Sequence, residues 1–225
     1  MTATLRNSVK VRNSVLLGIA GIGAAGAIAL GPAQAQAADI PVNPAGDTNP
    51  ASAPATAPGD KQLDVVGALQ PNGYYCGPAA SRIALSAHGT PPSFDELATD
   101  MGTTRAGTQS IDDITRVLNQ RDNGYTSVKF DSPTVSPEQT ATLRTDVINA
   151  INDNDPVVAN IVGQVSDTHG ETHRYAGGHY LTITGYSNDG HTVTITDPAD
   201  RKGDNTYQLS IDDMAGWMAT RGYSH

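Results

Sequence analysis

Basic residues are scarce in this sequence of 225 residues, which has 14 lysines and arginines against 23 acidic residues and a net charge of −9. A field of that sign repels phosphate groups, so neither a nucleic acid nor an anionic membrane surface is an expected partner. Cysteine is scarcer still, because the chain contains a single one. No long apolar run follows the first forty residues, so no membrane span is expected in the rest of the chain.

The one long apolar run lies near the N-terminus. Three basic residues precede an apolar segment over residues 15–31, and the small-residue stretch AQAQAA follows it. This order predicts a secretory signal peptide over residues 1–37, cleaved after Ala35 or Ala37; a membrane anchor is the alternative. Cleavage would leave 11 basic and 23 acidic residues, a net charge of −12. We therefore expect a secreted, soluble and monomeric protein.

The composition changes again after the signal peptide. Residues 38–62 are rich in Pro, Ala and Thr and poor in large apolar side chains. Such a segment buries too little surface to offset the entropy of ordering, so it is predicted to be a disordered linker. Residues 63–225 have a globular composition and are predicted to form a single domain.

Helix signals dominate the first half of this domain and strand signals dominate the second. A helix is predicted from Gly77-Pro78 to Gly89. Further helices are predicted after the capping residues Ser93, Ser110, Ser136 and Ser210. Strands are predicted over residues 156–162, 180–187, 191–197 and 207–210. This order predicts an α+β fold, with a helical part packed on a C-terminal antiparallel sheet.

The single cysteine, Cys76, stands in the stretch YYCGPAAS. A lone cysteine in an exported protein is paired between chains, inert in the core, or reactive. Pro78 suits a first helical turn, which would place Cys76 at a helix N-terminus. The partial positive charge of that end favours the nucleophilic thiolate, so we favour a reactive role for Cys76 over burial in the core.

A nucleophilic thiol needs a base, and the chain has six histidines. Surface positions are expected for His88, His191 and His225. His169 and His173 have a spacing that a metal ion could use, but we interpret their polar, Gly-rich segment, residues 163–178, as a mobile loop. His179, in GGHYLTITGY, remains as the candidate base.

The two strands around residue 188 place an aspartate near this histidine. Their apolar residues are all odd-numbered, and a three-residue loop, 188–190, with Gly190 in the left-handed conformation would pair Ile183 with Ile195. His179 and Asp197 would then be diagonal neighbours, with backbones roughly 7–8 Å apart and side chains within hydrogen-bonding reach. Asp197 would fix the imidazole tautomer. The alternative is that Asp197-Pro198 only ends the strand.

Gln70 is a candidate oxyanion donor. It lies six residues before Cys76, across the turn-like stretch PNGYY. Its amide could donate a hydrogen bond to a developing negative charge beside the backbone N–H of Cys76. The alternative is an exposed loop glutamine.

Taken together, the glutamine, YYCGPAA, GGHYLTITGY and TITDPA resemble the motifs of papain-like cysteine peptidases of the bacteriocin-processing (double-glycine) type, in particular their stand-alone secreted members. The resemblance covers most of residues 65–200 and implies a papain-like fold. By motif match, Cys76 would be the nucleophile, His179 the base and then the acid, Asp197 the orienting residue and Gln70 the oxyanion donor. Transporter-linked members often have an acidic residue before the cysteine, where this chain has Tyr75.

These observations predict a secreted cysteine peptidase that cleaves a peptide or protein substrate through a Cys76 thioester. No metal or organic cofactor is implied. One alternative is an acyl or peptidyl transferase that uses the same thioester. Another is a catalytically silent extracellular peptide-binding domain. The motifs do not define the substrate sequence.

Overall fold

The computed structural model describes residues 59–225. The predicted signal peptide, residues 1–37, and nearly all of the predicted linker, residues 38–62, lie outside the described residues. The last two linker residues form strand β1 (Lys61–Gln62), which pairs antiparallel with β4 (Thr172–Ser187). The ordered domain therefore begins slightly before residue 63.

The helices of the described residues lie where the capping signals predict them. They are α1 (Cys76–Leu85), α2 (Phe94–Met101), α3 (Ile111–Arg121), α4 (Pro137–Asn152) and α5 (Ile211–Trp217). Ser93 and Ser136 form complete capping boxes before α2 and α4, which satisfies N–H groups that a helix start otherwise leaves unpaired. Over residues 59–225, no helix is both long enough and apolar enough to cross a membrane.

Seven strands form one antiparallel sheet with the order β2-β7-β3-β4-β5-β6, and β1 adds to β4. The remaining strands are β2 (Ser127–Lys129), β3 (Val157–Ser166), β5 (Thr192–Thr196), β6 (Thr206–Ser210) and β7 (Gly222–Ser224). The predicted α+β class is confirmed. The short strands β1, β2 and β7 were not predicted, because two or three residues carry too little alternation to be recognised.

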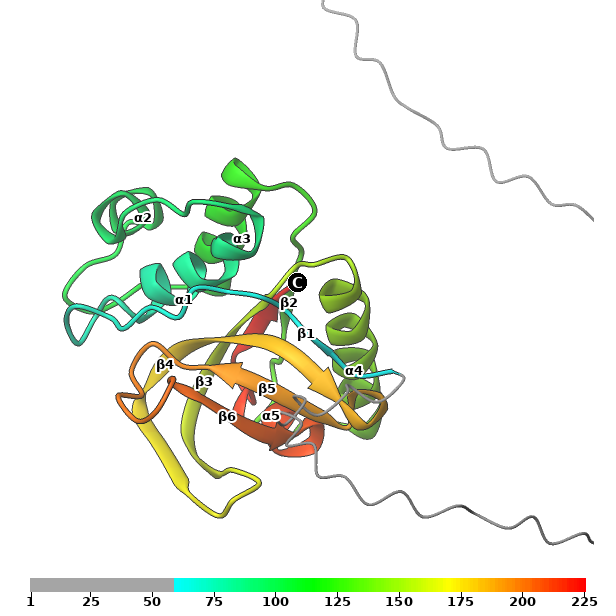
Figure 1. Cartoon of the computed structure of the whole chain (residues 1–225). Helices are drawn as coiled ribbons and strands as arrows, with labels where there is room; N and C mark the ends of the chain where they lie inside the picture. The colour runs from blue at the N-terminus through cyan, green and yellow to red at the C-terminus, as the bar shows by residue number, and fades with distance from the viewer. Residues whose placement is uncertain (1–58) are drawn as a thin grey trace, which may run out of the picture. The chain divides into compact units, whose positions relative to one another are not determined.

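Helices cover both faces of the sheet, because successive strand residues point to opposite faces. On one face Val157 and Ala159 pack with Leu143 of α4 and with side chains of α5. On the other face Val158 and Tyr180 pack with α1, α2 and α3. Figure 1 shows these three helices grouped together and α4 apart from them. The sheet is thus the shared wall of two apolar clusters, and each fully buried aliphatic side chain contributes roughly 1.5–3 kcal/mol.

The segment interpreted as a mobile loop, residues 163–178, is instead most of a β-hairpin. Strands β3 and β4 pair from Gly163↔Tyr175 to Ser166↔Thr172, with a bulge between Ile161 and Gly163. Gly163 and Gly178 have φ angles of +98° and +89°, which favour glycine. The prediction was wrong because glycines that form a bulge resemble loop glycines in the sequence.

The β4–β5 hairpin has the predicted pairing but not the predicted turn. Ile183 pairs with Ile195, as expected. However, Ser187 pairs with Thr192, so the turn has four residues, the 3₁₀ segment η2 (Asn188–Gly190) and His191. A bulge between Ile183 and Gly185 absorbs the extra residue. The register beside the candidate site is therefore correct although the turn was predicted one residue too short.

Candidate active site

Cys76 is the first residue of α1, after Tyr75 as N-cap. The first backbone bond of the helix runs from the N–H of Ala79 to the carbonyl of Tyr75, at 2.9 Å. Pro78 has no N–H to leave unpaired, and the N–H groups of Cys76 and Gly77 precede the first helical hydrogen bond. The thiol therefore lies half-buried at the positive end of a helix.

A cavity of about 190 Å³ opens in front of the thiol, and Cys76, Thr108, Gly178, His179 and Arg221 are among the residues that line it. The glycine after the cysteine is required by packing. A Cβ atom at Gly77 would lie 2.4 Å from the Oγ1 atom of Thr108, so only glycine lets this cavity wall approach the helix start.

His179 on β4 and Asp197 after β5 form a buried pair. The Nε2 atom of His179 lies 2.8 Å from Oδ1 of Asp197, and the two side chains are 4% and 0% exposed. The predicted contact between these residues is therefore present. Because Nε2 faces the carboxylate, Nδ1 is the ring nitrogen that remains for the thiol of Cys76.

The three side chains shift one another's ionisation. Burial would raise the pKa of the Cys76 thiol, but its hydrogen bond to His179 and the charge of that imidazole hold the pKa below its ordinary value. Burial would lower the pKa of His179, but the hydrogen bonds to Asp197 and Cys76 raise it to about 9. Burial opposes ionisation of Asp197, yet its contact with His179 leaves the pKa of that carboxyl lowered. The arrangement favours a thiolate, an imidazolium and a carboxylate together.

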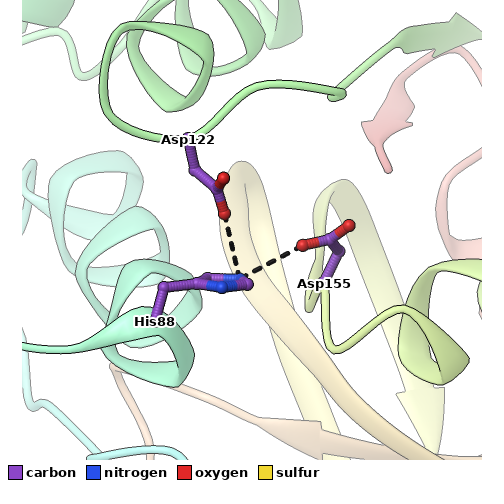
Figure 2. A group of neighbouring side chains, drawn as sticks. All are labelled: His88, Asp122 and Asp155. Atoms are coloured by element: carbon purple, nitrogen blue, oxygen red, sulfur yellow. Dashed lines mark ion pairs between the residues drawn. The ribbon is translucent and has the colours of Figure 1, made fainter.

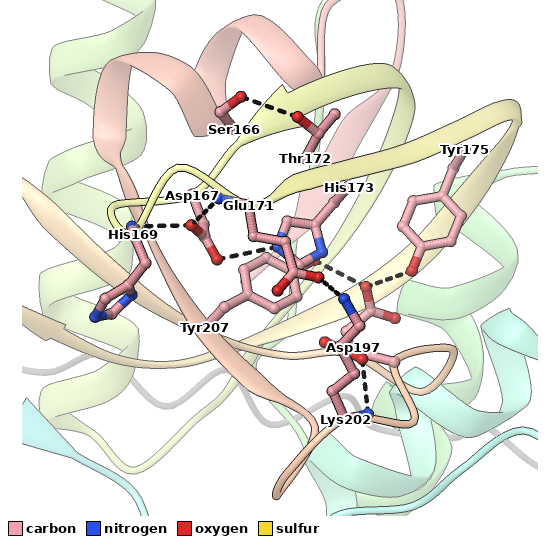
Figure 3. A network of polar contacts seen from close by, with 11 residues as sticks. Ser166, Asp167, His169, Glu171, Thr172, His173, Tyr175, Asp197, Lys202 and Tyr207 are labelled. Atoms are coloured by element: carbon pink, nitrogen blue, oxygen red, sulfur yellow. Dashed lines mark hydrogen bonds and ion pairs between the residues drawn. The ribbon is translucent and has the colours of Figure 1, made fainter.

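Two tyrosines that the sequence did not indicate hold the second oxygen of this carboxylate. The hydroxyl groups of Tyr175 and Tyr207 donate to Oδ2 of Asp197, at 2.9 and 2.8 Å (Figure 3). The backbone N–H of Ala199 donates to Oδ1, at 2.8 Å. With the contact to His179, the buried carboxylate has four partners, which offsets the cost of burying its charge.

The same tyrosines hold the two histidines of β4 in place. The ring of Tyr175 stacks on His179, with centroids 4.0 Å apart, and the ring of Tyr207 stacks on His173, with centroids 3.7 Å apart. His173 is buried and lies 3.2 Å from Oδ2 of Asp167, whereas His169 is exposed. The structure thus separates the two histidines whose spacing a metal ion could have used. The alternation of His173 and Tyr175 was the missed signal, and it continues the strand toward His179.

Gln70 lies beside the strand end that supplies Asp197, but its side chain does not reach into the cavity. Its backbone N–H donates to the carbonyl of Pro198, at 2.8 Å, and its Nε2 atom donates to the carbonyl of Asn72, at 2.7 Å. Its Oε1 atom is buried and has no hydrogen-bond partner among the described residues. A primary amide has two N–H bonds, so one remains available for a substrate.

Comparison with solved structures gives three distant relatives. The chain is similar to a protein described as a C39-like peptidase from Bacillus anthracis, at 12% identity and a TM-score of 0.49, over 73% of this chain and 96% of that one. It is similar to the double-glycine-motif protease of an AMS/PCAT transporter, solved with the leader peptide, at 14% identity and a TM-score of 0.43, over 73% and 91%. The peptidase domain of Streptococcus ComA, a bifunctional ABC transporter of a quorum-sensing pathway, matches at 17% identity and a TM-score of 0.44, over 73% and 94%.

No curated protein gives a significant match. The family comparison is more informative, because the profile of the Peptidase_C39 like family matches residues 61–224. That range holds every helix and strand named above and covers well over half of the sequence. The chain therefore belongs to the Peptidase_C39 like family, whose membership supports a cysteine peptidase.

Proposed function

We propose that this protein is a secreted cysteine peptidase in which Cys76 is the nucleophile, His179 the base and then the acid, and Asp197 the residue that orients the imidazole. The observation that carries this proposal is the buried contact of 2.8 Å between His179 and Asp197 beside a thiol whose pKa is lowered. Family membership independently supports peptidase activity.

The reaction starts with the ion pair already formed. The thiolate of Cys76 attacks the carbonyl carbon of the scissile bond, and the resulting oxyanion accepts hydrogen bonds from the backbone N–H of Cys76 and from the free N–H of Gln70. The imidazolium of His179 then donates its proton to the leaving nitrogen, and the C–N bond breaks to leave a thioester. Water attacks the thioester, gives a proton to His179, and the carboxylic acid product leaves as the thiolate reforms.

Cleavage profiling tests this proposal. The purified secreted form is incubated with a proteome-derived peptide mixture, and new peptide ends are identified by mass spectrometry. We expect ends that are absent with Cys76→Ala and that appear about 10²–10³-fold more slowly with Gln70→Ala, the usual cost of losing one oxyanion donor. Equal sets of ends from the native protein and Cys76→Ala would reject the peptidase assignment.

The proposal also includes export and a monomeric state. The support for export is the charge and apolar pattern of residues 1–37. N-terminal sequencing of protein from the culture medium should begin at residue 36 or 38, and light scattering should give the mass of one chain. Protein that stays in the cell pellet with Met1 intact would contradict export.

A further inference from the structure

His88, Asp122 and Asp155 come together from three separate segments (Figure 2). His88 ends the 3₁₀ turn η1 (Ser86–His88) that follows α1, Asp122 follows α3, and Asp155 lies between α4 and β3. The Nε2 atom of His88 is 3.1 Å from Oδ2 of Asp122 and 3.1 Å from Oδ1 of Asp155. All three ligand atoms lie within 4.8 Å of one another.

Hydrogen bonding leaves this cluster unsatisfied. One ring N–H cannot serve two carboxylates well, and Oδ2 of Asp122 is buried without a hydrogen-bond partner among the described residues although the imidazole is near. The hydroxyl group of Tyr125 is also buried without a partner, and this residue is only 6% exposed. After burial, the charges of Asp155 and Asp122 are what raise the pKa of Tyr125, which places its hydroxyl near both carboxylates.

The charge of the cluster also lacks compensation. Burial, and then the charge of Asp122 among its neighbours, raise the pKa of Asp155 against the opposing effect of His88. Arg121 lines the adjacent cavity, but its guanidinium is paired with Asp100. Two carboxylates beside one neutral imidazole carry a charge of −2, which a divalent cation would neutralise.

We propose that His88 Nε2, Asp122 Oδ2 and Asp155 Oδ1 bind a divalent first-row transition-metal ion. Mixed imidazole and carboxylate ligands suit zinc, manganese or cobalt better than calcium, which takes oxygen ligands. An ion roughly 2.1 Å from each atom would see the edges of 3.1 Å under an angle of about 95°, which fits neighbouring octahedral positions.

Such an ion would act as a structural cross-link. It would join the end of the helix that begins at Cys76 to the end of α3 and to the turn before β3, segments that are distant in the sequence. Because an ion that binds only the folded state shifts the folding equilibrium by about 100-fold at 100 times its dissociation constant, the site predicts a metal-dependent melting temperature.

Thermal unfolding of the secreted form, stripped with a chelator and then titrated with Zn²⁺, Mn²⁺, Co²⁺ or Ca²⁺, tests the proposal. We expect a transition metal to raise the melting temperature in the native protein and in His191→Gln, an exposed-histidine control, but not in His88→Gln or Asp155→Asn. Each variant is compared with its own metal-free form, so a lower intrinsic stability does not affect the result. Bound Co²⁺ should give visible absorption bands that Asp122→Asn removes.

Three results would overturn the site. The first is no rise with any of these metals. The second is an equal rise in the native protein and His88→Gln, which indicates binding elsewhere. The third is a rise with Ca²⁺ alone that survives in His88→Gln, which would indicate a carboxylate site without the imidazole.

A separate observation concerns Arg221, which lines the cavity in front of Cys76. Its side chain makes no ion pair or hydrogen bond within residues 59–225, although acidic residues outnumber basic ones in the sequence. The opposite wall comes close only because it is glycine: a Cβ atom at Gly178 would be 3.8 Å from the guanidinium of Arg221.

We infer that Arg221 recognises a carboxylate of the substrate, so that peptides with an acidic residue beside the scissile bond are preferred; this inference rests on the proposed peptidase function. A guanidinium offers paired N–H donors that match a carboxylate. One such charged hydrogen bond corresponds to about 10- to 100-fold in kcat/KM.

Paired peptides that differ only in Glu against Gln at each position around an identified cleavage site test the inference. The native protein and the control Arg201→Gln should prefer one Glu peptide by at least tenfold, and Arg221→Gln should lose that preference. Cleavage by the native protein with no preference, or a preference that Arg221→Gln retains, would overturn the role of Arg221 and leave the peptidase assignment intact. No cleavage of any peptide beyond the Cys76→Ala background would overturn both.

Discussion

Strand β4 has two buried histidines six residues apart, and each contacts an aspartate. His179 lies 2.8 Å from Asp197, with side chains 4% and 0% exposed, and His173 lies 3.2 Å from Asp167, with both side chains 6% exposed. The pairs differ in what surrounds them. His179 also hydrogen-bonds to the Cys76 thiol at the cavity, whereas the ring of His173 is covered by Tyr207.

The comparison shows that a buried histidine–aspartate pair is not in itself a catalytic base. Tyr207 links the two regions, because its ring packs on His173 while its hydroxyl group binds Asp197. The inner pair therefore supports the carboxylate of the outer pair through packing and has no reacting group of its own. We expect substitutions in the outer pair to affect chemistry and equivalent substitutions in the inner pair to affect mainly stability.

The largest difference is expected between His179→Gln and His173→Gln. Without His179 the thiol loses the hydrogen bond and positive charge that lower its pKa, so its alkylation by iodoacetamide at pH 6 should fall close to that of an ordinary cysteine. His173→Gln should keep most of that reactivity and melt at a lower temperature. Fast alkylation of His179→Gln at pH 6 would contradict the proposed ion pair.

A smaller difference is expected between Asp197→Asn and Asp167→Asn. Loss of the carboxylate that orients a catalytic histidine can lower kcat by about 10⁴-fold, and Asp197→Asn should approach that loss. Asp167→Asn should cost less than about tenfold, since its carboxylate touches no reacting group. Rates on one cleaved peptide make the comparison, and equal losses in the two variants would show that the inner pair also takes part in the chemistry.

Tyr207→Phe should have a moderate effect. It removes one of the four hydrogen bonds to the buried Asp197, and a hydrogen bond to a charged group contributes about 1.5–3 kcal/mol. The pKa of His179 should fall as that of Asp197 rises, which NMR titration can follow. Tyr223→Phe is the matched control, because its hydroxyl binds the carboxylate of Asp146, on α4, at 2.6 Å. A shift of the His179 pKa in the control as well would show that the effect is not specific.

The smallest effect is expected in the pH dependence of stability. The lowered pKa of Asp197 gives stability that is present above its unfolded value, about 3.9, and lost in more acidic solution. The raised pKa of His179 gives stability that is present below about 6.5 and lost as the pH rises through about 9. The melting temperature should thus decline at both ends, and His179→Gln should remove the alkaline decline. An alkaline decline that persists in this variant would assign it to another group.

Short-range patterns predicted much of this protein. The capping residues Ser93 and Ser136 mark their helices because each side chain satisfies backbone groups only three residues away. The proline after Cys76-Gly77 likewise indicates a helix start. The pairing of Ile183 with Ile195 follows from alternation, because a slip of one residue would turn every apolar side chain outward.

The packed chain decided the features that depend on distant segments. The partners of Asp197 come from β4 and β6, and no local pattern states that Tyr175 and Tyr207 meet at one carboxylate. The inner hairpin was missed because bulge glycines hide its alternation, and His88 meets Asp122 and Asp155 only after three separate segments have packed. Hydrogen bonds within a turn can be predicted from neighbouring residues, whereas the burial and charge that shift a pKa arise only from the whole packed domain.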